Sequence, residues 1–163
     1  MIRRIEIERF SLITSKGFDD VVATLNSGIG HPDMAEFWRS THGARSGTEL
    51  ESTIEKAVGK MGLMLFVQFD HGTIVSKTTG RDASRITRFV ICNPLIMKEM
   101  AKHVPDAGSY APVTVLVDER TDGVHLSYDR MASLLAPYEN PDALEVARNL
   151  DMRVEDLLRR AAA

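Results

Sequence analysis

The segment at 85–97, RITRFVICNPLIM, constrains the fold of this chain more than any other stretch. Its apolar first half predicts a buried strand. A helix is expected directly after it, because Asn93 suits the N-cap position and Pro94 suits the first helical position, where no N–H group is needed. The free N–H groups at such a helix start, together with the positive end of the helix dipole, attract carboxylate or phosphate groups. The junction is therefore a candidate binding position.

The size and composition of the chain predict a soluble globular protein. It has 163 residues, of which 44% are hydrophobic and 26% charged, so we expect a single domain over residues 1–163. The net charge of −3 gives no general attraction to nucleic acid or to an anionic membrane, and neither is an expected partner. One cysteine cannot form an internal disulfide, and we find no secretory signal or membrane-spanning run. These features predict a cytoplasmic protein.

Hydrophobic periodicity predicts the first elements of the chain. Apolar and polar residues alternate over 5–12, which predicts a strand with a bend near its middle. Apolar residues at helical spacing over 18–29 predict an amphipathic helix. Ser46 followed by Glu49 has the spacing of a capping box, so a second helix is expected to begin there and to end at Gly62.

Three further segments have less regular patterns. Residues 31–45 are expected to form an inserted loop with a short helical turn around 34–39. Residues 63–69 are apolar at almost every position, which predicts a strand that is buried on both faces, or a central strand. The polar residues 73–84 are expected to form a strand followed by a loop.

The second half of the chain predicts a hairpin and a long helix. Valines alternate from Val113 onward, and a Thr-Asp-Gly turn at 121–123 joins this strand to a returning one. Asn140 and Pro141 repeat the helix-start pattern, and the apolar spacing after them predicts a long C-terminal helix. The expected fold class is α+β, with a mainly antiparallel sheet and helices packed on one of its faces.

Four separated motifs carry a family resemblance: FDHG at 69–72, RFVICNP at 88–94, YAPVTVLV at 110–117 and VHLSYD at 124–129. Through them, the chain from about residue 58 to residue 163 resembles the family of domains of unknown function 302. The resemblance implies a β-α-β4-α fold, similar in outline to TATA-binding-protein-like and helix-grip folds, and a homodimer. It implies no activity. The segment 31–45 is longer than the family pattern, which supports an insertion there.

Three residues are candidates for catalysis. Asp70 and His71 follow a predicted strand, and a carboxylate with an imidazole suits general acid–base chemistry, although neighbouring strand residues point to opposite faces. The alternative is a turn in which Asp70 caps backbone groups. Cys92 precedes a helix start, which lowers the pKa of a thiol, but a cysteine that ends an apolar strand also suits a core position.

Four residues are candidates for ligand contacts, namely His71, Asn93, Tyr110 and Tyr128. The two tyrosines lie near predicted strand ends, where a hydroxyl group can orient a ligand; core packing with a satisfied hydroxyl group is the alternative. Asn93 is also a structural cap. The five histidines lack metal-ligand spacing, so no metal site is predicted. A haem or other metal held by a single histidine with a methionine is the open alternative, and the sequence identifies no cofactor.

Three functions of different classes fit the sequence. The first, preferred because helix-over-sheet folds tend to leave a cavity, is a dimeric module that binds a small apolar or anionic ligand between the sheet and the C-terminal helix. The second is an enzyme that uses His71 as a base, with Asp70, Cys92 or Asp129 as its partner. The third is a structural or interaction domain without a ligand.

Overall fold

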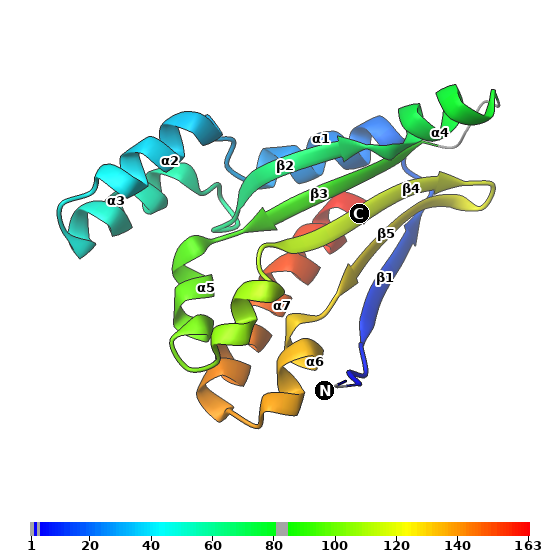
Figure 1. Ribbon diagram of the computed structural model, residues 1–163. Coiled ribbons are helices and arrows are strands. Elements are labelled where there is room, and N and C mark those ends of the chain that lie inside the picture. Colours follow the sequence, from blue (N-terminus) through cyan, green and yellow to red (C-terminus); the bar gives the residue numbers. More distant parts are fainter. Residues whose placement is uncertain (1, 3, 81–84) are drawn as a thin grey trace.

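The computed structural model describes residues 2, 4–80 and 85–163, and in this part of the chain five strands form one sheet (Figure 1). The strands are β1 Arg9–Thr14, β2 Met64–Asp70, β3 Ile86–Cys92, β4 Val113–Arg120 and β5 Gly123–Asp129. Their order across the sheet is β1-β5-β4-β3-β2, and all four strand pairs are antiparallel. The predicted antiparallel sheet is confirmed.

Helices cover one face of this sheet (Figure 1). The longest, α7 (Pro141–Ala162), crosses the sheet and begins as predicted, because the side chain of Asn140 accepts a hydrogen bond from the Ala143 N–H group. The other helices are α1 Phe18–Gly28, α2 Met34–Gly43, α3 Gly47–Ala57, α4 His71–Thr79, α5 Pro94–Ala101 and α6 Met131–Leu135, with short 3-10 helices at Pro105–Ser109 and Ala136–Tyr138. The predicted α+β fold with a long C-terminal helix is confirmed.

The core fills the space between the sheet and α7. Leu126 and Tyr128 alternate with half-buried residues along β5 and belong to the same buried cluster as Leu150 of α7. Where Phe89 of β3 and Leu157 of α7 line the remaining gap, there is no room for a water molecule. At this position the pocket expected between the sheet and the C-terminal helix is filled by side chains, because both surfaces are apolar and close-packed.

The opposite face of the sheet is more exposed, and the strand register arranges its side chains in rows. One row, read from β2 to β5, consists of Phe69, Arg88, Leu116 and Ser127, each opposite the next. Phe69 and Arg88 are exposed, whereas Leu116 and Ser127 are half-buried. We call this side of the sheet, defined by that row, the open face.

Segment 31–45, expected to be a loop with a short helical turn around 34–39, contains the longer helix α2, Met34–Gly43. The Asp33 side chain accepts a hydrogen bond from the Glu36 N–H group at 2.8 Å, which caps α2. Phe37 on this helix is buried with Ile54 and Met64 in a second, smaller apolar cluster. The apolar pattern is irregular because only a few residues of α2 face this cluster, while most of its side chains are exposed.

The segment 63–69, expected to be buried on both faces, forms an edge strand. Only the beginning of β2 is buried, and Val67 and Phe69 are 39% and 41% exposed. An apolar run does not distinguish a central strand from an edge strand that pairs along one side. The strand expected after residue 73 is also wrong, because α4 occupies His71–Thr79; residues 81–84 lie outside the described residues.

Candidate functional site

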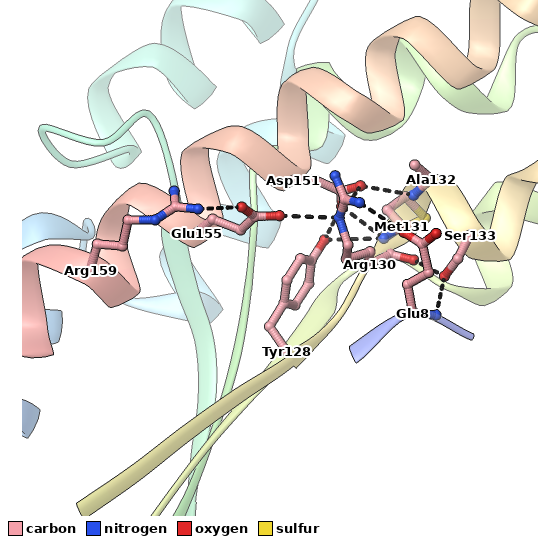
Figure 2. A network of polar contacts seen from close by, with 9 residues as sticks. All are labelled: Glu8, Tyr128, Arg130, Met131, Ala132, Ser133, Asp151, Glu155 and Arg159. Carbon is pink, nitrogen blue, oxygen red and sulfur yellow. Dashed lines mark hydrogen bonds and ion pairs between the residues drawn. The ribbon is translucent and has the colours of Figure 1, made fainter. Parts of the chain in front are cut away.

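A buried carboxylate connects β5, α6 and α7 (Figure 2). Asp151 of α7 is fully buried, and its Oδ1 atom accepts hydrogen bonds from the Tyr128 hydroxyl group at 2.6 Å and from the Met131 N–H group at 2.7 Å. Its Oδ2 atom accepts a hydrogen bond from the Ala132 N–H group at 3.1 Å. Asp151 thus satisfies the free N–H groups at the start of α6, although it lies 19 and 20 residues further along the chain.

Burial is the largest influence on the pKa of this carboxylate. Burial raises the pKa of Asp151, while the hydrogen bonds from Tyr128 and the nearby Arg130 guanidinium oppose that rise. Burial also raises the pKa of Tyr128, and the charge of Asp151 raises it further. Arg130 lies 3.1 Å from Glu155 and 2.7 Å from Glu8. The Tyr128 hydroxyl group, a predicted ligand contact, is therefore engaged within the protein.

The two predicted site residues at the β3–α5 junction are also engaged in internal contacts. Asn93 accepts a hydrogen bond from the Leu95 N–H group at 2.9 Å and donates one to the Gly62 carbonyl oxygen at 3.0 Å. Cys92 is buried, and its thiol donates to the Asn93 carbonyl oxygen at 3.6 Å. Burial raises the pKa of Cys92 to about 11, so this residue remains a thiol at neutral pH.

Asp70 and His71 lie at the start of α4 and have different surroundings. The Asp70 carboxylate accepts hydrogen bonds from the Thr73 N–H group at 2.9 Å and from the Thr73 hydroxyl group at 2.6 Å. The hydroxyl contact is the main reason that the pKa of Asp70 is lowered. The His71 ring stacks on Phe69, with ring centroids 5.8 Å apart. In the described part of the chain, no hydrogen bond or ion pair joins His71 to the three proposed partners.

A hollow of about 380 Å³ lies on the open face, next to α6, where β4 begins and β5 ends. Its lining includes the hydroxyl-bearing residues Tyr110, Thr114 and Ser127, and apolar surface is contributed by Leu116 and Leu134. Two predicted ligand residues, Tyr110 and Tyr128, therefore border one hollow. The hydroxyl group of Tyr128 binds Asp151, and that of Tyr110 lies 3.0 Å from the Tyr138 hydroxyl group. We call it the open-face hollow.

The charges in the open-face hollow are unequal. Two arginines, Arg9 and Arg88, face one carboxylate, that of Asp129. Arg9 binds Asp129 in bidentate geometry, at 2.6 and 2.9 Å. Arg88 donates a hydrogen bond to the Thr114 hydroxyl group at 3.0 Å, and within residues 2, 4–80 and 85–163 it forms no ion pair with a carboxylate. One guanidinium in the hollow is therefore uncompensated.

Sequence reasoning missed Arg88 as a site residue. The residue was part of the motif at 88–94, but its neighbours in the strand directed attention to the apolar core. A usable signal is the alternation itself, since a charged residue between the buried residues Thr87 and Phe89 must point to the other face. The lack of a carboxylate partner is visible only in the folded protein.

A second feature missed in the sequence is a carboxylate–histidine pair at the β4–β5 hairpin. The Nε2 atom of His125 lies 2.8 Å from the Asp122 Oδ1 atom, and this hydrogen bond lowers the pKa of Asp122. The His125 side chain borders a smaller hollow of about 230 Å³, which also contains Arg9 and Ser11. The Asp122 carboxylate orients the His125 imidazole. In the sequence, this pair is indicated by the three-residue spacing of the two residues across a turn.

Two other kinds of site were sought within the described residues. No group of three or more histidine, cysteine, aspartate or glutamate side chains is placed there to hold a metal ion. None of the described helices combines the length and the apolar character needed to cross a membrane.

Comparison with known proteins gives a family and a fold. A family model described as "Domain of unknown function DUF302" matches residues 40–161, and therefore begins before residue 58. The crystal structure of an uncharacterized conserved protein DUF302 from Bacillus stearothermophilus is similar, with a TM-score of 0.67 and 13% sequence identity over 94% of this chain and 97% of that chain. At this identity the similarity concerns the fold. A search of curated proteins finds no match.

Proposed function

The chain belongs to the family described as Domain of unknown function DUF302, and because this description assigns no activity, we propose a function from the geometry of the open-face hollow. The protein is a binding module for a small organic anion that carries both a carboxylate or similar group and an apolar part. The single observation that carries this proposal is the Arg88 guanidinium, which lies in the hollow without a carboxylate partner in the described part of the chain.

The surroundings of Arg88 suit such a ligand. A guanidinium binds carboxylates through two parallel hydrogen bonds, and a charged hydrogen bond contributes about 1.5–3 kcal/mol to binding. Tyr110 and Ser127 line the same hollow and add polar groups to it, although the Tyr110 hydroxyl group also contacts the Tyr138 hydroxyl group at 3.0 Å. Leu116 and Leu134 supply apolar surface. The volume of about 380 Å³ falls within the usual range for small-molecule sites.

A homodimer and a cytoplasmic location complete the proposal. The exposed side chains of Val67 and Phe69 on the edge strand β2 support contact with a second copy. The single cysteine, which is buried and free, supports a reducing compartment. Sedimentation equilibrium tests the dimer, since a protein that remains monomeric at high micromolar concentration contradicts this part of the proposal.

The binding test uses benzoate, which combines a carboxylate with an apolar ring, and its neutral analogue benzamide. We expect saturable amide shifts in ¹H–¹⁵N spectra for residues around the hollow with benzoate, and no saturation with benzamide. Replacing Arg88 by Met should weaken benzoate binding by at least about tenfold, because the charged contact is lost. Arg148→Met, an exposed arginine on α7 outside the hollow, is the matched control.

Three results would contradict the proposal: no saturable shift with benzoate, equal binding of benzamide, or unchanged affinity in Arg88→Met. A native mass spectrum of freshly purified protein gives an independent check. An extra mass that is lost on denaturation, and that is absent from Arg88→Met, would identify the natural ligand class.

A further inference from the structure

A second and larger hollow lies on the helical side of the molecule, away from the open face. It is a groove of about 980 Å³ between α5, α7 and the turn before β2. Its apolar residues are Met61, Leu95, Ile96, Val146 and Met152, and we call it the α5–α7 groove. Met152 is 58% exposed although its side chain is apolar. Methionine side chains adapt to irregular partner surfaces.

The groove is long and shallow. Its lining residues on α7 extend from Val146 to Arg159, which corresponds to about 20 Å along a helix with a rise of 1.5 Å per residue. Small ligands require a site that encloses most of their surface, whereas this groove is open along its length. An occupant with its own secondary structure, such as a helix of three to four turns, matches this shape.

The charges at the rim of the groove are also unequal. Glu99 is paired with Lys98 and Lys102, and Asp156 lies 3.7 Å from Arg160. By contrast, Lys60 and Arg153 have no ion pair with any described carboxylate, although both line the groove. The rim therefore presents two uncompensated cations and, in the described residues, no uncompensated carboxylate among those lining the groove.

The Arg153 guanidinium lies close to the backbone of the turn at Gly62. A Cβ atom at Gly62 would lie 2.7 Å from the Arg153 Nη1 atom, so a glycine allows the guanidinium to rest over this turn. Gly62 also has a positive φ of 69°, which favours glycine. The turn itself is held to α5 by the Asn93 side chain, which donates to the Gly62 carbonyl oxygen at 3.0 Å.

From the shape and these charges we propose that the α5–α7 groove binds an acidic amphipathic helix of a partner protein. The apolar side of that helix covers Met152 and the other apolar residues of the groove, and its carboxylates pair with Lys60 and Arg153. A second copy of this chain fits less well, because a two-fold interface through the groove brings four uncompensated cations together. This inference is independent of the open-face hollow.

The test uses a fluorescein-labelled model peptide of about 18 residues, with leucines at i, i+3, i+4 and i+7 and glutamates on the flanks. Its counterpart has lysines in place of the glutamates. Fluorescence anisotropy should show micromolar binding of the acidic peptide and at least tenfold weaker binding of the basic one. The double variant Lys60→Glu/Arg153→Glu should reverse this preference, while Arg148→Glu, on α7 outside the groove, should not.

Met152→Glu provides a second test that does not depend on the double variant folding, because the side chain is exposed. This variant should weaken binding of the acidic peptide at least fivefold. Failure of the acidic peptide to bind, equal binding of both peptides, or an unchanged preference in the double variant would overturn the inference. A dimer of the chain that Met152→Glu dissociates would assign the groove to a second copy instead. Arg88→Met should leave peptide binding unchanged.

Discussion

The two faces of the sheet are built from the same strands, but they differ in how completely their apolar side chains are buried and their polar groups are paired in the folded protein. On the covered face, Leu126 and Tyr128 are buried, and even the buried carboxylate of Asp151 has hydrogen-bond donors at both oxygens. On the open face, Leu116 is half-buried and Arg88 has no described carboxylate partner. The covered face thus contributes most to stability, whereas the open face keeps a charged group that folding does not pair, and this difference is the basis of the proposed binding role.

The largest effect is expected for Asp151→Ala, which tests how much the buried network stabilises the covered side. The variant removes the acceptor of the Tyr128 hydroxyl group and of the Ala132 N–H group, and it leaves the Met131 N–H group with its longer contact of 3.3 Å to the Tyr128 oxygen. We expect a loss of about 3–5 kcal/mol in the free energy of unfolding, measured by urea denaturation. Asp156→Ala, on the exposed side of the same helix, should cost less than about 0.5 kcal/mol. Equal losses in the two variants would contradict this contrast.

A pair of leucines compares the two faces directly. Leu126→Ala on the covered face should lower the free energy of unfolding by about 2–5 kcal/mol, because a fully buried leucine leaves a cavity. Leu116→Ala, on the open face of the neighbouring strand, should lower it by at most about 1 kcal/mol, since its side chain already contacts solvent. Similar losses would show that the open face is covered in solution, as in a dimer through this surface.

The pH dependence of stability tests the electrostatics of the covered face. Burial raises the pKa of Asp151 in the folded state, so the folded protein binds a proton more tightly there than the unfolded chain does. The stability advantage of the wild type over Asp151→Asn should therefore be largest below about pH 4 and decrease as the pH rises, by at most about 1.4 kcal/mol per pH unit. Urea denaturation of both proteins between pH 3 and 7 measures this difference. An advantage that grows with pH would mean that the hydrogen bonds outweigh burial.

Local signals in the sequence predicted much of the fold correctly. Ser46, Asn93 and Asn140 were each predicted to start a helix, and in each case the side chain accepts the expected hydrogen bond from a backbone N–H group. Caps depend on residues two or three positions apart, so their partners are visible in the sequence. The edge position of β2 was missed because it depends on which strands assemble beside it, a property of the whole sheet.

The candidate site was less predictable than the fold. Tyr110 was chosen for its place near a strand end, and it does line the open-face hollow. Tyr128 was chosen for the same reason, yet its hydroxyl group binds a carboxylate 23 residues away, a contact that no local pattern indicates. Arg88 is distinguished by the lack of a carboxylate partner among the described residues, which is known only after the chain has folded.

The smallest effect is expected for Arg88→Met on stability, and it separates a binding role from a structural one. Among the described residues, the guanidinium donates a hydrogen bond to the hydroxyl group of the half-buried Thr114 and lies 5.9 Å from the ring of the exposed Phe69. Contacts of this kind contribute little, so the free energy of unfolding should change by less than about 1 kcal/mol, measured by urea denaturation. A loss above about 2 kcal/mol would instead assign Arg88 to the fold, and the uncompensated charge would no longer indicate a ligand. A small loss combined with weakened benzoate binding is the result that only an anion-binding role predicts.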